Sequence, residues 1–162
     1  MPKKNPAALV KVGINFLGIV AEWEADPTER RAAWELYVEL ITRISTQPLS
    51  PDQGLLREAL FSLHALFETT RQILRNAGPD VGASQKSVGG IAVAVLNQRL
   101  RPFLAKWHPE LADYESTRQS NAGQRQHEQA WQNSAELRQE LEQLRKDLDE
   151  YADALAEIAG VK

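Results

Sequence analysis

Apolar positions recur at helical spacing along most of this chain, and the polar residues between them mark where helices begin and end. The clearest beginning is Asp26-Pro27-Thr28-Glu29, in which Asp26 can cap a helix, Pro27 suits its first position and Glu29 can complete a capping box. The spacing predicts a helix from Pro27 to Ser45, ended by Pro48. Its buried positions are Ala33, Tyr37, Leu40 and Ile44.

The same device occurs at Ser50-Pro51-Asp52-Gln53, where Ser50 is the expected cap. We therefore predict a helix from Pro51 to Asn76, and the sequence Asn76-Ala77-Gly78-Pro79 is typical of a helix end. Its apolar stripe comprises Leu56, Leu60, Leu63, Phe67 and Leu74.

A loop rich in Gly, Ser and Asp is expected from Gly78 to Gly90. Beyond it, apolar residues at helical spacing predict a helix from Val88 to Trp107, which Pro102 should kink. Because the residue before a proline disfavours helical geometry, His108-Pro109 predicts a break followed by a short helix through Tyr114.

The C-terminal part carries the most regular pattern, a heptad seam of apolar residues spaced alternately four and three apart. The seam comprises Leu137, Leu141, Leu144, Leu148, Tyr151, Leu155 and Ile158. Such a seam either completes the core of its own chain or zips to another chain, and we favour packing on the bundle. Trp131 lies outside the seam, so its exposure would indicate a partner surface.

The N-terminal segment is open to two interpretations. Alternation of Val10, Val12, Ile14 and Phe16 is compatible with a strand, as is that of Ile91, Val93 and Val95. Helical spacing fits both segments as well, and two isolated strands stabilise little, so we predict a helix from Ala7 to Glu24.

Lys3 and Lys4 precede an apolar run from Ala7 to Ala21, an order also found in signal peptides. Lys11 and Asn15 interrupt the run, which is too short to span a bilayer, so we expect a cytoplasmic protein.

Together these elements predict an all-α fold, a helical bundle of four to five helices with a long C-terminal heptad helix. The chain has 162 residues, of which 43% are hydrophobic and 25% charged, as in ordinary globular domains. We expect one domain overall, with residues 1–118 forming the bundle and residues 119–162 the heptad helix that packs on it or on a partner.

Chemistry-bearing motifs are scarce. The three histidines, His64, His108 and His127, lack metal-ligand spacing, and the chain has no cysteine. The segment from Gly82 to Ser87 has a Lys-Ser pair before a helix but lacks the glycine spacing of a phosphate-binding loop. We therefore predict no enzyme, no catalytic residue, no metal and no cofactor.

Basic residues cluster on either side of the glycine-rich loop, where an antiparallel pair of helices would bring them to one face. The candidate ligand-binding residues are Arg71, Arg75, Lys86, Arg99 and Arg101, with Lys106 nearby. This face is suited to a phosphate or an acidic partner, although solvated surface charge is the more common explanation.

The segment from Leu96 to Pro109, with Tyr37 to Ile44 and Leu66 to Pro79 upstream, resembles an uncharacterised all-helical domain of bacterial proteins. The resemblance implies a helical bundle, and a setting in bacterial conflict or defence systems. It brings no catalytic motif to transfer.

Three functions follow as hypotheses. The first is a non-enzymatic adaptor or regulator that binds another protein, or its own copy, through Trp131 and the heptad seam. The second is a bundle that binds a ligand or phosphate with its basic face. The third is a membrane-acting bundle that uses the apolar first helix. A net charge of −3 gives no field for binding nucleic acid.

Overall fold

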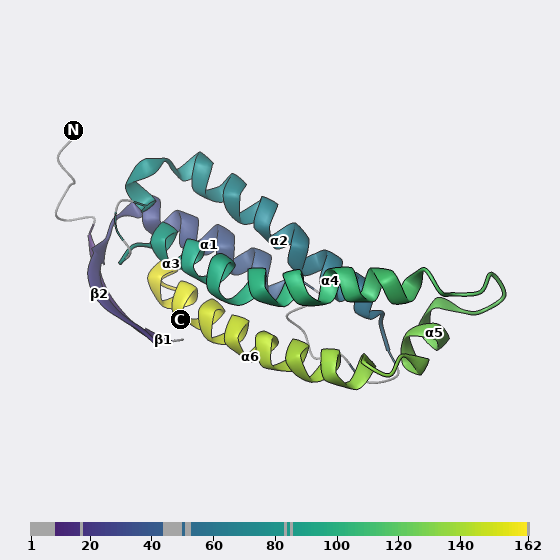
Figure 1. The fold of residues 1–162 in the computed structure, drawn as a ribbon. Coiled ribbons are helices and arrows are strands. Elements are labelled where there is room, and N and C mark those ends of the chain that lie inside the picture. The colour runs from purple at the N-terminus through teal and green to yellow at the C-terminus, as the bar shows by residue number, and fades with distance from the viewer. Residues whose placement is uncertain are drawn as a thin grey trace.

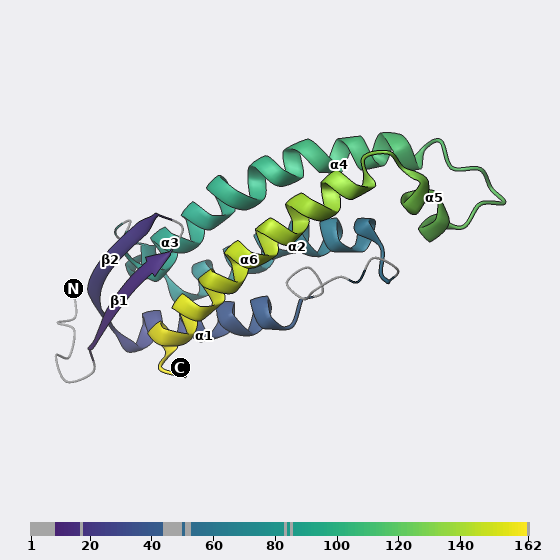
Figure 2. The ribbon, with the colours of Figure 1, turned by 90° about the horizontal axis from the view of Figure 1, so that it is seen from below.

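The structure is a computed structural model that describes residues 9–16, 18–43, 50, 53–82, 84 and 86–161. Most of these residues are helical, and a single hairpin precedes the helices, with strands β1 (Val10–Phe16) and β2 (Ile19–Ala25). The long helices run side by side in alternating directions, and the hairpin lies across one end of them (Figures 1 and 2).

The structure confirms a mostly helical fold, and the hairpin is a small addition to the predicted all-α architecture. It corrects the predicted helix from Ala7 to Glu24, of which residues 7, 8 and 17 lie outside the described part. Its strands pair antiparallel, with Val10 opposite Ala25 and Phe16 opposite Ile19. Alternation was the better signal, because the buried positions Val12, Ala21 and Ala25 share one face that packs on the helices. A two-stranded hairpin alone is barely stable, so its packing on the helices stabilises it, and β1 contacts the last helix directly.

The first helix, α1 (Pro27–Ile41), begins where the sequence predicts. The Asp26 side chain accepts a hydrogen bond from the Glu29 backbone, and the Glu29 side chain accepts one from the Asp26 backbone. The expected end at Ser45 lies outside the described residues, as do Ile44 and Pro48.

The second helix, α2 (Leu56–Ala77), begins later than Pro51, the predicted first residue. Pro51 and Asp52 lie outside the described residues, and Gln53 and Gly54 form a bend. The prediction of a capping box at Ser50 is therefore wrong. The reason is that a side chain distant in the sequence caps this helix.

A continuous helical rod follows the short 3-10 helix η3 (Pro79–Gly82). It consists of α3 (Val88–Val95), a π-helical turn η4 (Leu96–Leu100) and α4 (Arg101–Glu115). The distortion expected near Pro102 is present as the wide turn η4, in which the Arg101 backbone N–H donates to the carbonyl of Leu96.

The predicted break at His108-Pro109 is wrong, because α4 continues through Pro109. Trp107 and Leu111, on either side of that proline, are both completely buried. Their packing holds the backbone helical at a position that local preference disfavours.

The chain ends with α5 (Gln124–Ala130) and the long helix α6 (Ser134–Ala159), which packs along α1. Every position of the heptad seam from Leu137 to Ile158 is buried within the single chain. At the end of α6, the Arg30 guanidinium of α1 donates to the carbonyls of Ile158 and Ala159. No helix in the described part of the chain is long and apolar enough to cross a membrane.

Candidate functional site

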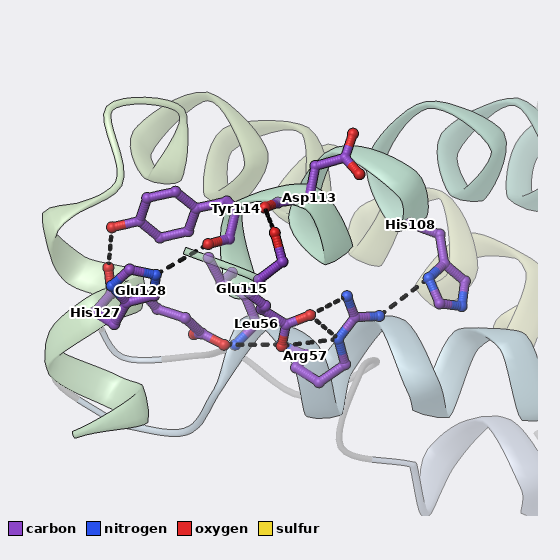
Figure 3. Close-up of polar contacts among 9 residues, drawn as sticks. Leu56, Arg57, His108, Asp113, Tyr114, Glu115, His127 and Glu128 are labelled. Carbon is purple, nitrogen blue, oxygen red and sulfur yellow. Dashed lines mark hydrogen bonds and ion pairs between the residues drawn. The ribbon is translucent and has the colours of Figure 1, made fainter. Parts of the chain in front are cut away.

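Two polar regions lie at opposite ends of the helices. One is the closed end, where the start of α2, the end of α4 and α5 meet (Figure 3). The other is a cleft formed by the turn of the hairpin, the end of α2, η3 and the start of α3.

At the closed end, Glu128 of α5 caps α2. Its side chain is 1% exposed, and its two carboxylate oxygens accept hydrogen bonds from the backbone N–H groups of Leu56 at 2.7 Å and Arg57 at 3.2 Å. A carboxylate in this position satisfies orphan donors of the first turn and complements the positive end of the helix dipole. The cap replaces the one expected at Ser50.

The Arg57 side chain joins the same region to α4. Its Nε donates to Glu115 at 2.9 Å, and its Nη1 lies 3.0 Å from Nδ1 of His108 (Figure 3). Because a guanidinium group only donates, Nδ1 of His108 is the acceptor in this contact. The ring of His64 packs edge-on against that of His108, with 5.8 Å between centroids.

Aromatic side chains close the outer part of this end. Tyr114 stacks on His127 and on Trp131, and its hydroxyl donates to the carbonyl of His127. Trp131 also meets Trp107 edge-on, with 6.0 Å between ring centroids. The side chains of the closed end therefore bind one another, and they form a structural junction that fixes α5.

Among the described residues, no group of three or more His, Cys, Asp or Glu side chains is placed to hold a metal ion. The histidines of the closed end instead pair with an arginine and a tyrosine.

The cleft at the other end has a volume of about 1250 Å³. Its wall includes the first turn of α3, which Ser87 caps by accepting a hydrogen bond from the Gly90 backbone at 3.1 Å. Gly89 allows this turn to pack on η3, because a Cβ atom there would lie only 2.5 Å from the carbonyl oxygen of Val81. The glycines of the loop therefore shape the cleft.

The lining combines apolar and cationic groups. Its apolar side chains are Ile19, Val20, Leu74, Val81, Val93 and Ala94, and its polar ones are Arg75, Ser84, Lys86, Asn97 and Gln98. Two of the apolar residues are unusually accessible, since Val20 is 69% and Val93 47% exposed. No acidic residue is among the described residues of the lining, although Asp80 lies between two of them in the sequence.

The structure divides the five predicted ligand-binding residues. Arg75 and Lys86 line the cleft. Arg71 and Arg101 each place a guanidinium over the ring of Phe67, at 5.6 and 5.5 Å from its centroid. Arg99 faces the other way and lies 4.0 Å from the carboxylate of Asp147 on α6. Lys106 also faces α6, where it pairs with Glu136 and Glu140.

The residues predicted for a partner interface lie inside the molecule. Trp131 is 8% exposed, and the seam positions Leu137, Leu141, Leu144, Leu148, Tyr151 and Leu155 are all buried. Burial raises the pKa of the Tyr151 hydroxyl. In this conformation the seam contacts its own chain.

Sequence reasoning missed the hairpin's part in the cleft and the amides Asn97 and Gln98. The alternation of the N-terminal segment was the signal for the hairpin, whereas Asn97 and Gln98 gain significance only from the η4 turn that places them beside the loop. Comparison with protein-family models, with curated proteins and with solved structures gives no match.

Proposed function

We propose that this chain is a non-enzymatic helical bundle that binds a small molecule with an anionic group and an apolar body in the cleft. The single observation that carries the proposal is the lining, in which Arg75 and Lys86 stand among accessible apolar side chains. Clefts of this composition bind ligands by burying apolar surface and fixing one polar group.

The electrostatics of the cleft favour an anion. Arg75 and Lys86 are both exposed, and neither forms an ion pair among the described residues. The start of α3 adds the partial positive charge of a helix N-terminus beside them. Phosphate and carboxylate groups suit an arginine paired with a lysine, because the guanidinium binds two oxygens at once.

A suitable first probe is n-hexyl phosphate, followed by amide chemical shifts in a ¹H–¹⁵N NMR titration. We expect saturable shifts at Gly78, Gly89 and Gly90, which line the cleft. The double substitution Arg75→Glu with Lys86→Glu should weaken binding at least tenfold, and hexan-1-ol should bind far more weakly than the phosphate.

The matched control is Arg118→Glu with Arg125→Glu, which changes the net charge equally on exposed residues outside the cleft lining. This variant should bind hexyl phosphate like the wild type. Equal weakening in both double variants would show only a non-specific charge effect. Absence of saturable shifts in the wild type would overturn the proposal.

Adaptor function remains a second proposal, supported by apolar side chains on the outer surface. Trp34 and Ile41 of α1 are 46% and 42% exposed, and they lie two helical turns apart on one face. Phe61 of α2 is exposed as well, at 70%, whereas Trp131 and the heptad seam are buried. Loss of binding to a purified partner in Trp34→Ala would support it.

A further inference from the structure

A second cationic site lies beside the cleft and consists of Arg71 and Arg101, which belong to two different helices. Arg71 belongs to α2 and Arg101 to α4, and both guanidinium groups lie over the ring of Phe67. Each guanidinium carbon is within 5.6 Å of the same ring centre, so the two are at most about 11 Å apart. We call these three residues the arginine pair on Phe67.

The fold leaves these two charges with little neutralisation. Arg71 has one carboxylate neighbour, Glu68, at 3.6 Å, and that side chain is 70% exposed. Among the described residues, Arg101 forms no ion pair, and its Nε donates to Oδ1 of Asn97 at 3.2 Å. An aromatic ring face attracts both cations, and it also holds their flat groups in place.

The arginine pair is continuous with the cleft. Asn97, which binds Arg101, itself lines the cleft, and Arg71 lies one helical turn before Arg75 on the same face of α2. A line of positive groups therefore runs from Lys86 and Arg75 to the arginine pair. Arg99 is excluded from this line because it turns to Asp147.

We infer that the ligand of the cleft carries two phosphate-like groups, one at Arg75 and Lys86 and the other at the arginine pair on Phe67. The inference rests on the proposed function, since the first group is the anion of the cleft. An apolar body between the two groups would lie along Val93 and Ala94 of the lining. Two separated anionic groups bind more tightly than one because the second contact is intramolecular.

The test compares hexane-1,6-diol bisphosphate with n-hexyl phosphate by isothermal titration calorimetry and NMR. In the wild type, the bisphosphate should bind at least tenfold more tightly than the monophosphate. In Arg71→Gln with Arg101→Gln, the ratio of the two affinities should fall to about one. Butane-1,4-diol and octane-1,8-diol bisphosphates test whether the spacing is matched.

Arg99→Gln is the matched control, because it removes a neighbouring guanidinium that faces α6, and it should keep the wild-type ratio. If hexyl phosphate fails to bind, the proposed function itself is wrong. If hexyl phosphate binds but the bisphosphate has no advantage, only the second group is disproved. Binding to vesicles that contain phosphatidic acid, without binding to free bisphosphate, would overturn the inference in favour of a lipid headgroup.

Discussion

The two ends of the molecule treat positive charge in opposite ways. At the closed end, the start of α2 is capped by Glu128, and Arg57 is paired with Glu115. At the cleft end, the start of α3 stands beside Arg75 and Lys86, and the described lining contains no acidic residue. At the closed end, carboxylates of the chain neutralise the helix start and the arginine. At the cleft end, the positive charges of Arg75 and Lys86 are exposed to solvent.

From this difference we expect the closed end to contribute to stability and the cleft end to binding. At the closed end, the Glu128 carboxylate binds the backbone N–H groups at the start of α2 and so contributes to stability. Substitutions at the closed end should therefore lower the free energy of unfolding, whereas substitutions at the cleft end should change binding and leave stability almost intact.

The largest effect is expected for Trp131→Ala. Trp131 is buried against Tyr114 and Trp107, so its truncation leaves a cavity between α4 and the start of α6. We expect a loss of about 3–5 kcal/mol in the free energy of unfolding, measured by urea denaturation. Trp34→Ala, at an exposed position, should cost less than about 1 kcal/mol. Equal losses would contradict the packing described for the closed end.

A smaller loss, about 2 kcal/mol, is expected for Glu128→Ala, because two backbone N–H groups of α2 lose their acceptor in a buried place. Hydrogen exchange at the first turn of α2 should accelerate in the same variant. Glu110→Ala, on the exposed surface of α4, is the control and should have little effect. An unchanged stability in Glu128→Ala would show that α2 needs no distant cap.

Glu140 supports the closed end through Trp107, and its effect should depend on pH. The hydrogen bond from Lys106 lowers the pKa of Glu140 below its ordinary value of 4.5, and a hydrogen bond from the Trp107 indole acts in the same direction. A lowered pKa means that ionised Glu140 stabilises the folded state when the pH is above the ordinary pKa of this group. This contribution is lost as the pH falls through the lowered pKa.

Glu140→Gln should therefore lower the thermal midpoint by about 2 °C at pH 7, since exposed pairs contribute little. The difference from the wild type should shrink as the pH falls below 4.5, the ordinary value for this group. Thermal melts followed by circular dichroism between pH 3 and pH 7 provide the measurement. A difference that stays constant over that range would indicate a packing effect without a role for charge.

The smallest effect on stability is expected for Arg75→Glu with Lys86→Glu, the variant that should weaken ligand binding at least tenfold. Both side chains are exposed and lack ion-pair partners among the described residues, so the free energy of unfolding should change by less than about 0.5 kcal/mol. Urea denaturation without ligand is the measurement. A loss as large as that of Glu128→Ala would remove the contrast between the two ends.

The sequence predicted the parts of the fold that depend on local signals. The capping box at Asp26 and Glu29 defines the start of α1, and the apolar spacing of α2, α3 and α6 identifies their buried faces. It also brought Arg75 and Lys86 together as candidates, since Arg75 precedes the glycine-rich loop and Lys86 lies within it, and both line the cleft.

Tertiary contacts decided the features that were missed. The hairpin alternates like a strand and is stabilised by the helices beneath it, which a local pattern does not reveal. Pro109 stays helical because Trp107 and Leu111 are buried beside it, and the cap of α2 comes from Glu128. The arginine pair on Phe67 likewise depends on how α2 and α4 pack, and the sequence pattern alone does not determine that packing.

The distant cap of α2 has a consequence for how the chain is made. Glu128 lies 72 residues after Leu56, so α2 leaves the ribosome long before its capping carboxylate has been synthesised. The first turn of that helix is completed only after α5 has been synthesised, and contacts so far apart in sequence slow folding. We therefore expect a chain that stops before Glu128 to exchange the amide hydrogens of Leu56 and Arg57 faster than the full chain does.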